Sequence, residues 1–468
     1  MTKRNVDVAI IGAGSAGLVA FRTAKKWTDN VVLIEGGPYG TMCARVGCMP
    51  SKLLIAAAEA AHAAQQATEF GVRVGEVSVD GVAVMNRVRS ERDRFVGFVV
   101  DGVENIPETQ RIRGYARFVS DHVLQVDDHT TVTAKSIVIA TGSTPTHPPI
   151  LEGLGDRLVV SDDIFDWTDL PQSVAVFGPG VIGIELGQAL SRLGVEVLVF
   201  GRGGPLGPLT DPKVAAAAKE SLGREFYLDT DANVSRVTRI DDAVRIEYDG
   251  LDGQQLTVDV DYVIAATGRS PNVKGLALEN TSLPLDDQGV PVFDPATMRI
   301  GDSHAFIAGD VDSDRPILHE ASDEGRIAGE NAARFPHVTP QRRSSPLGIV
   351  FSDPQMAMVG DRFADLDSEN VVIGEVSFKD QGRSRVMLKN DGVLRVYASK
   401  RSGRFLGAEM FGPRAEHMGH LLAWAHQSGM TITQMLDMPY YHPVIEEGLR
   451  TALRDADRKL RQRVTEAA

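Results

Sequence analysis

Two glycine fingerprints limit the possible folds of this chain more than any other feature. The first, Gly12-Ala-Gly14-Ser-Ala-Gly17, follows the apolar run that starts at Val6. Its first glycine permits a tight turn, its second lets the backbone approach a pyrophosphate, and its third lets a helix pack closely on a strand. The pyrophosphate then lies at a helix N-terminus, where free N–H groups favour negative charge. Glu35 ends the next apolar run and can accept from both ribose hydroxyls, so a dinucleotide-binding βαβ unit is predicted.

The second fingerprint, Gly178-Pro-Gly180-Val-Ile-Gly183, follows the run SVAVF. The next strand, VEVLVF, leads into Gly201 and Arg202, where an acid would grip an adenosine 2′-OH. Without that acid, and with an arginine beside the site, a 2′-phosphate is tolerated, which indicates NADPH. The alternative is that Arg202 is a solvated loop residue, and the sequence leaves both open.

Each fingerprint is followed by an apolar run that ends in Ala-Thr-Gly. The first, IVIATG, ends at Thr141 and Gly142, and the second, VIAATG, ends at Gly268. A fingerprint with its own ATG motif therefore occurs twice, which predicts two nucleotide-binding domains of one architecture. The long spacing and the two copies exclude a solenoid.

Stretches rich in proline and glycine divide the chain. They follow the first ATG near Thr146, follow the second at RSPNV, and recur around Pro336–Pro346. The segment beyond mixes strand-like runs with a helical stretch, Ala415–Ser428, and carries no nucleotide signature, so we expect an interface domain. The charged tail, Gly448–Ala468, is expected to be a solvated terminal helix.

The only two cysteines, Cys43 and Cys48, lie five residues apart. In an ideal helix their Cα atoms would be about 8–9 Å apart, beyond the ~7 Å limit for a disulfide. A bridge therefore needs an irregular turn, for which Gly47 gives the freedom. Pro50 suits the first turn of a following helix, which places Cys48 near its N-terminus and favours the thiolate. A redox pair is predicted, because a metal site would lack ligands: the nearest histidine is His62.

Charge and composition exclude several classes of protein. The net charge of −14 argues against a nucleic-acid or anionic-membrane surface. No run approaches the ~18 apolar residues of a membrane span. Lys3 and Arg4 precede an apolar run, but Asp7 interrupts its start and the glycine turn follows, so a signal peptide is not expected. Two cysteines are no secreted disulfide framework, and a cytoplasmic protein is expected.

The segment GTMCARVGCMPSK resembles the active-site segment of the pyridine nucleotide–disulfide oxidoreductases, which include dihydrolipoamide dehydrogenase, glutathione reductase and mercuric reductase. The resemblance covers nearly the whole chain, with both fingerprints, both ATG motifs, AFIAGD, FSDPQMAMVG and YHPVIEE. By overall pattern the chain is most similar to dihydrolipoamide dehydrogenase. The chain departs from the family pattern at three places near the expected substrate. Gly-Thr-Met precedes the first cysteine where Gly-Gly-Thr is usual, and Arg-Val-Gly precedes the second where many members have Asn-Val-Gly. Tyr-Tyr precedes the His-Pro pair where many lipoamide dehydrogenases have His-Ala.

The resemblance implies roles for single residues. Cys43 would exchange with substrate, and Cys48 would face the flavin. Lys52 would lie near the flavin and pair with Glu185. Asp310 would hold the ribityl chain of the flavin.

The resemblance also implies a catalytic base. A dithiol can reduce a disulfide only if a base takes its proton. His442 would be that base, oriented by Glu447 and supplied by the partner subunit. Taken alone, a His-Pro pair is more often a structural turn.

The implied fold is α/β, with two doubly wound nucleotide-binding domains, for FAD and NAD(P), plus a C-terminal α+β dimerisation domain. The expected domains are an FAD-binding domain at 1–146, an NAD(P)-binding domain at 147–270, a second FAD-binding or central part at 271–345 and an interface domain at 346–468. The expected FAD-binding residues are Gly12, Gly14, Gly17, Glu35, Lys52, Thr141, Gly142 and Asp310. The expected NAD(P)-binding residues are Gly178, Gly180, Gly183, Glu185, Arg202 and Gly268.

The expected reaction is oxidation of a dihydrolipoyl group with reduction of NAD⁺, in a homodimer that serves a 2-oxo acid dehydrogenase complex. An alternative is an NADPH-dependent reductase of a small disulfide such as glutathione. Arg202 favours this alternative. Arg22 and Arg326 also favour it, because they fall where glutathione reductases place arginines for the carboxylates of glutathione. The other interpretation is that Arg22 and Arg326 are ordinary surface arginines on helices. A third alternative is a non-enzymatic flavin-holding interaction or sensor protein.

Overall fold

The computed structural model describes residues 1–466, which divide into two compact units. The first unit combines Met1–Leu53, Asn86–Thr146 and Arg269–Ser344, and the second combines Leu54–Met85, His147–Gly268 and the chain from Ser345 onward. Two of the dividing points fall inside helices, α3 (Cys48–Gln66) and α4 (Gly81–Glu104). The predicted domain boundaries at 146, 270 and 345 stay a prediction.

The first unit is built on a sheet in the order β17-β18-β19-β6-β1-β2-β3, in which β19, β6, β1, β2 and β3 are parallel. The run Val8–Ile11 of β1 is buried throughout, as expected of a parallel strand that is covered on both faces. β4 and β5 extend β6 in antiparallel fashion. The strands are β1 (Thr2–Ile11), β2 (Val31–Glu35), β3 (Arg111–Arg113), β4 (Ala116–Ser120), β5 (Val123–Val126), β6 (Thr130–Ile139), β17 (Phe293–Asp294), β18 (Arg299–Ile300) and β19 (Ala305–Ile307).

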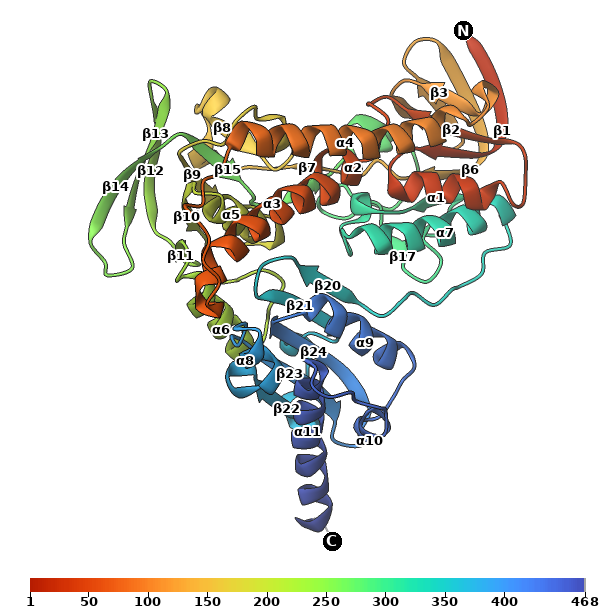
Figure 1. The fold of residues 1–468 in the computed structure, drawn as a ribbon. Helices are drawn as coiled ribbons and strands as arrows, with labels where there is room; N and C mark the ends of the chain where they lie inside the picture. The colour runs from red at the N-terminus through yellow and green to blue at the C-terminus, as the bar shows by residue number, and fades with distance from the viewer. Residues whose placement is uncertain (467–468) are drawn as a thin grey trace. The chain divides into compact units, whose positions relative to one another are not determined.

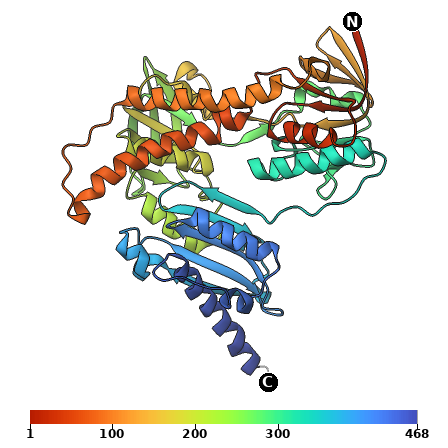
Figure 2. The same ribbon diagram turned by 45° about the vertical axis from the view of Figure 1, so that its right-hand side comes forward.

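Helices α1 (Ser15–Ala24) and α7 (Leu318–Arg334) of this unit lie side by side (Figures 1 and 2). Two glycines of α7 allow the approach. A Cβ on Gly325 would lie 2.3 Å from the carbonyl oxygen of Ala16, and one on Gly329 would lie 2.4 Å from that of Ala20. The helix that follows the first fingerprint is therefore fixed by backbone contact with α7.

The second unit contains a parallel sheet in the order β11-β10-β9-β15-β8, the arrangement of a nucleotide-binding fold. An antiparallel sheet, β12-β13-β14, adjoins it and contributes Val244, Ile246 and Val260 to the same hydrophobic core. The elements are β8 (Leu158–Val160), β9 (Ser173–Phe177), α5 (Val181–Arg192), β10 (Glu196–Phe200), α6 (Pro212–Leu222), β11 (Tyr227–Asp229), β12 (Val234–Ile240), β13 (Ala243–Asp249), β14 (Gln255–Val260) and β15 (Tyr262–Ala265).

The C-terminal part of this unit is an antiparallel sheet in the order β20-β21-β24-β23-β22 with helices packed on it. The predicted helix at Ala415–Ser428 is α9. The elements are β20 (Leu347–Val350), β21 (Gln355–Gly360), β22 (Val371–Ser377), α8 (Gly382–Val386), β23 (Val393–Ser399), β24 (Phe405–Gly412), α9 (Ala415–Gln427), α10 (Ile432–Leu436) and α11 (Glu446–Glu466).

The terminal helix α11 corrects one expectation. It is helical, as predicted, but its first half is not solvated: Leu449, Ala452, Leu453 and Ala456 are buried against the sheet. These residues recur at helical spacing and form one apolar stripe. The helix then runs away from the sheet toward the C-terminus (Figure 2). Ala467 and Ala468 of the predicted tail lie outside the described residues.

Within residues 1–466, no helix has the length and apolar character that a transmembrane span requires.

Candidate functional site

The cysteine segment contains the irregular turn that its spacing requires. Helix α2 (Met42–Val46) ends just before Gly47, whose φ and ψ are −124° and −116°, and α3 begins at Cys48. Thr41 caps α2 by accepting from Ala44 N at 3.3 Å. The break separates Cys43 and Cys48 onto two helices, so the ideal-helix separation no longer applies.

The thiols of Cys43 and Cys48 are close enough to share a hydrogen bond. Cys43 is half-buried and Cys48 is exposed at the first residue of α3. A hydrogen bond with Cys48 raises the pKa of Cys43, and burial raises it further. A helix N-terminus stabilises an anion. Of the pair, Cys48 is therefore placed to carry the negative charge while Cys43 keeps its proton.

The first fingerprint has the shape that a pyrophosphate needs. Gly12 has φ +108°, and a Cβ there would lie 2.2 Å from the carbonyl oxygen of Ala140. A Cβ on Gly17 would lie 1.9 Å from the carbonyl oxygen of Gly12. Gly14, the N-cap of α1, has no atom within 4 Å of its Cβ position and leaves the helix N-terminus open. The residues present thus fit a dinucleotide at this turn.

Glu35 ends β2 beside this turn, as the sequence predicts. Its Oε2 accepts from Ala13 N and its Oε1 accepts from Gly37 N, each at 2.7 Å. These two bonds hold the carboxylate in place. Its hydrogen bonds to ribose hydroxyls stay a prediction.

Asp310, at the start of the 3₁₀ turn η8 (Asp310–Asp312), accepts from Ser143 Oγ at 3.0 Å. Ser143 in turn accepts from Arg269 Nε at 2.9 Å, and Arg269 Nη2 contacts Met42 Sδ at 2.9 Å. Sequence reasoning missed Ser143 and Arg269, although each directly follows an ATG glycine. The short strands β7 (Ser143–Pro145) and β16 (Arg269–Pro271) pair and bring them together.

The first ATG motif is tied to the chain after the second. Thr141 Oγ1 donates to the carbonyl oxygen of Asn272 at 2.8 Å, and Asn272 Nδ2 donates to the carbonyl oxygen of Thr141 at 3.0 Å. Gly142 and Gly268 both adopt positive φ, +67° and +108°. Both ATG glycines are therefore required by backbone conformation.

The second fingerprint repeats the geometry of the first. Gly178 has φ +104°, and a Cβ there would lie 2.4 Å from the carbonyl oxygen of Ala266. A Cβ on Gly183 would lie 1.9 Å from the carbonyl oxygen of Gly178. Gly180 caps α5 and has open space at its Cβ position. This turn can also receive a pyrophosphate.

The loop after β10 holds an arginine and an acid. Gly201 is buried, and Arg202 is exposed directly after it. Gly203 N donates to Asp231 Oδ1 at 2.6 Å, which brings a carboxylate to the same loop. Sequence reasoning missed Asp231, because it follows β11 rather than β10 and only the fold brings it here.

Glu185 is buried on α5, where its Oε1 accepts from Phe351 N at 2.9 Å. Lys52 lies on α3. The two residues belong to different compact units, so their pairing stays a prediction.

His442 and Glu447 contact each other, as the family resemblance implies. His442 Nδ1 lies 3.0 Å from Glu447 Oε1 and 3.1 Å from Oε2. The hydrogen bond from His442 lowers the pKa of Glu447, and a bond from Val444 N at 3.2 Å adds to this. His442 is 81% exposed, so its other ring nitrogen is available to a partner. His442 and Cys43 lie in different units, and their joint action stays a prediction.

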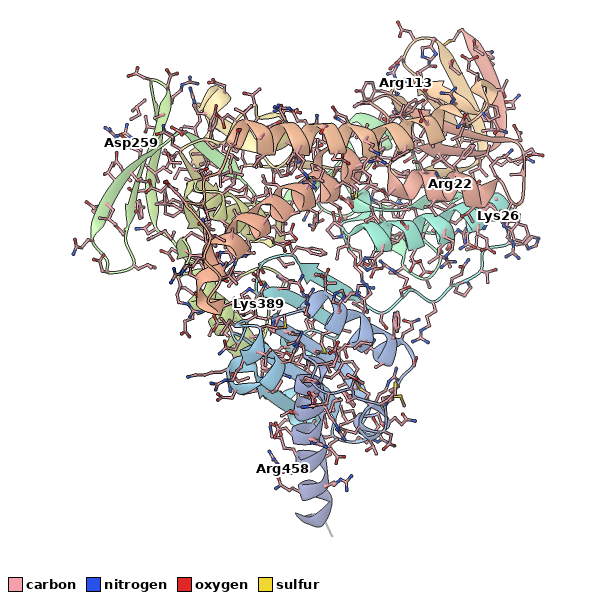
Figure 3. The ribbon with its side chains drawn as sticks, viewed as in Figure 1. Arg22, Lys26, Arg113, Asp259, Lys389 and Arg458 are labelled. Carbon is pink, nitrogen blue, oxygen red and sulfur yellow. The ribbon has the colours of Figure 1, made fainter. Side chains whose placement is uncertain are left out.

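Arg22 and Arg326 differ in their surroundings. Arg22 is exposed on α1, where Figure 3 labels it with Lys26. Arg326 is half-buried on α7 and donates to the side chain of Gln341. Of these two arginines, Arg22 is the exposed one. That Arg22 and Arg326 bind carboxylates of a substrate stays a prediction.

Comparisons with known proteins agree with this geometry. The family model described as pyridine nucleotide-disulphide oxidoreductase matches residues 6–325, and that of the family's dimerisation domain matches residues 347–453. The dihydrolipoyl dehydrogenase of Geobacillus stearothermophilus is 30% identical, over 94% of each chain, and that of Haloferax volcanii is 31% identical, over 96% of each. The flavoprotein disulfide reductase RclA of Escherichia coli shares the fold, with a TM-score of 0.80, 23% identity and coverage of 96% of this chain and 99% of that one.

These matches confirm the predicted fold class, with FAD and NAD(P) domains plus a C-terminal dimerisation domain, and the two cofactors FAD and NAD(P). They also rule out the non-enzymatic alternative, because the family consists of enzymes. The chain therefore belongs to the pyridine nucleotide-disulphide oxidoreductase family and is a flavoprotein disulfide oxidoreductase.

Proposed function

We propose that this enzyme oxidises a dihydrolipoyl group and reduces NAD⁺. The observation that carries the proposal is the contact between the Cys43 and Cys48 thiols across the break between α2 and α3. Relatives named dihydrolipoyl dehydrogenase that align over nearly the whole chain support this substrate. In the same proposal, the protein is a homodimer that serves a 2-oxo acid dehydrogenase complex in the cytoplasm.

The cofactors would be held by the residues that the sequence singles out. The first fingerprint and the turn at Asp310 would hold FAD, and the second fingerprint would hold the nicotinamide nucleotide. When bound, FAD supplies the two-electron relay between the cysteine pair and the nicotinamide. In this proposal the FAD residues are Gly12, Gly14, Gly17, Glu35, Lys52, Thr141, Gly142 and Asp310. The NAD(P) residues are Gly178, Gly180, Gly183, Glu185, Arg202 and Gly268.

The thiol chemistry starts from the Cys43–Cys48 disulfide. His442 takes the proton of one substrate thiol, and the resulting thiolate attacks Sγ of Cys43 and displaces Cys48 as a thiolate. The second substrate thiol then attacks the mixed disulfide, and the substrate leaves as a disulfide. One proton goes to Cys43 and the other stays on His442. The substrate has lost two electrons and two protons, and the enzyme has gained both.

The environment of the two thiols supports the proposed roles, in which Cys43 exchanges with the substrate and Cys48 leaves as a thiolate. The hydrogen bond with Cys48 and burial keep the pKa of Cys43 high, so Cys43 needs a base to exchange its proton. Glu447 fixes the ring of His442, and the bond from His442 lowers the pKa of Glu447. Cys48, at the N-terminus of α3, is the thiol that can stay ionised.

A second function is favoured by one observation. Arg202 is exposed beside the second fingerprint, where a guanidinium can bind a 2′-phosphate in bidentate fashion. The alternative is therefore an NADPH-dependent reductase of a small disulfide such as glutathione. Asp231 in the same loop counts against it, because a carboxylate repels a phosphate.

Steady-state assays of the purified protein decide between the two. Dihydrolipoamide with NAD⁺ should give the highest kcat/KM, and glutathione disulfide with NADPH should give little turnover. The reverse ranking would replace the first proposal by the second. A protein that turns over neither pair would contradict both.

A further inference from the structure

Two buried carboxyl groups at the turn that carries Asp310 contact each other through their side chains. Asp312 ends η8 and is 7% exposed, and Glu324 on α7 is fully buried. Neither residue belongs to a motif that the proposed chemistry uses. Two ionised carboxylates that contact each other away from water repel each other, so ionisation of both groups at once is unfavourable.

The charges around the pair do not balance. Arg343 forms ion pairs with Asp314, Glu320 and Glu324. Arg315 forms ion pairs with Asp314 and Glu320. The two guanidinium groups therefore face more carboxylates than they can neutralise. The acidic groups are Asp312, Asp314, Glu320 and Glu324, and the basic groups are Arg315 and Arg343.

The hydrogen bonds of the pair also leave one acceptor without a donor. Asp312 Oδ1 accepts from Asp314 N at 2.9 Å. Glu324 Oε2 accepts from Gly309 N at 2.8 Å, and its Oε1 accepts from Arg343. Asp312 Oδ2 is buried, and no hydrogen-bond partner among residues 1–466 reaches it. A proton between the two carboxyl groups would supply the donor that this oxygen lacks.

We propose that Asp312 and Glu324 hold one proton between them at neutral pH, and that this proton positions the Gly309–Asp310 turn. Glu324 acts directly on the turn, because it accepts from Gly309 N. Without the proton, repulsion would push the two carboxylates apart and loosen that bond. The positioning role rests on the proposed function, in which Asp310 holds the flavin.

The direction of the pH dependence follows from the surroundings of Asp312. Burial, followed by repulsion from Glu324, raises its pKa to about 8, and burial also raises the pKa of Glu324. An exposed carboxyl keeps its ordinary pKa, so the folded turn binds a proton that the unfolded chain does not. The resulting stabilisation is present at low pH, falls as pH rises, and is gone once pH passes through about 8.

The test measures the dissociation constant for FAD, from the fluorescence of flavin released on serial dilution of the holoenzyme. With a pKa of about 8, the protonated fraction falls from roughly nine-tenths at pH 7 to roughly one-tenth at pH 9. The dissociation constant should therefore rise about tenfold if only the protonated turn holds the flavin. In Asp312→Asn the amide supplies the missing donor at every pH, so this rise should disappear.

Asp314→Asn is the matched control. Asp314 is exposed and pairs with Arg343, but it lies outside the buried pair, so its variant should keep the tenfold rise. Equal pH dependence in the wild type and in Asp312→Asn would overturn the positioning role.

An infrared measurement tests the shared proton without relying on flavin binding. Between pH 7 and pH 9 the full-length chain should lose one protonated-carboxyl C=O band, and Asp312→Asn should not. A wild type that loses no such band overturns the shared proton. A protein that binds no FAD at either pH overturns the proposed function and the positioning role, while the infrared band still decides on the proton.

Discussion

The contact between the Cys43 and Cys48 thiols leads to a prediction for single substitutions. Cys43→Ser and Cys48→Ser should each abolish disulfide turnover and leave FAD bound, because both sulfurs are needed for one disulfide. The two act as a unit, so the double variant should be little worse than either single one. Dithiol oxidation is measured in steady state, and reduction of the bound flavin by NADH in stopped flow serves as the control. Near-normal turnover in either variant would show that the redox centre lies elsewhere.

Substitutions of Arg202 and Asp231 should change the preference between NADPH and NADH in opposite directions. Arg202→Ala should lower kcat/KM for NADPH by about tenfold to a hundredfold, from the loss of charge-assisted bonds of ~1.5–3 kcal/mol, and should leave NADH unchanged. Asp231→Asn removes a carboxylate from the same loop and should raise kcat/KM for NADPH. If the wild type strongly prefers NADH and Arg202→Ala behaves identically, Arg202 takes no part in recognition and the NAD-linked proposal is strengthened.

Among the secondary-structure elements, the contact between α1 and α7 is the most sensitive to added volume. A Cβ on Gly329 would lie 2.4 Å from the carbonyl oxygen of Ala20, so Gly329→Ala must separate the two helices. We expect a loss of about 1–3 kcal/mol, seen as a lower urea midpoint for the first unit. Gly97→Ala on α4 is the control: its Cβ meets open space, and the change should stabilise the helix by up to about 1 kcal/mol. Equal midpoints for both variants would contradict the close packing.

The elements that could be predicted from sequence are those with local signals. Both fingerprints, the strands before them and α9 occur where the patterns place them, because each depends on a glycine turn or a helical period. The buried face of α11 was missed because two of the four buried side chains named above are alanines, which give a weak apolar signal. Gly374 on β22 explains why small alanine side chains fill the space between α11 and the sheet. Its Cβ position lies 2.1 Å from the carbonyl oxygen of Ala452, so α11 and β22 approach each other closely.

The features of the candidate site also divide into those that could be predicted from the sequence and those that depend on the fold. The helix break at Gly47 follows from the spacing of the two cysteines, and the pairing of His442 with Glu447 is implied by the family resemblance; the structure contains both. The contact of Ser143 with Arg269 could not be predicted, because it depends on the pairing of two strands far apart in sequence. The Asp312–Glu324 pair was missed for a related reason: no motif marks a carboxyl group whose burial only the fold creates.

For the whole molecule, the dimerisation domain predicts a homodimer. Trp424 and Leu421 lie three residues apart on α9 within the matched domain and are 68% and 43% exposed, so they leave apolar surface on one face of this helix. Trp424→Glu should shift the protein from dimer to monomer in light scattering, because a charge would be buried in the interface. Trp27→Glu changes a tryptophan of the first unit that is 53% exposed beneath Arg334, and should leave the dimer intact. A wild type that is monomeric and active would contradict the prediction.

A shared active site makes a stronger prediction than dimerisation alone. If His442 completes the site of the partner subunit, then Cys43→Ser and His442→Ala homodimers are both impaired at every site. A heterodimer of the two variants, however, contains one site in which both residues are intact. Co-expression with two different affinity tags should therefore yield a heterodimer with up to about half of wild-type turnover, and about a quarter in the unsorted mixture. If His442 served the Cys43 of its own chain, each subunit of the heterodimer would keep one defect, and turnover would stay at the level of the homodimers.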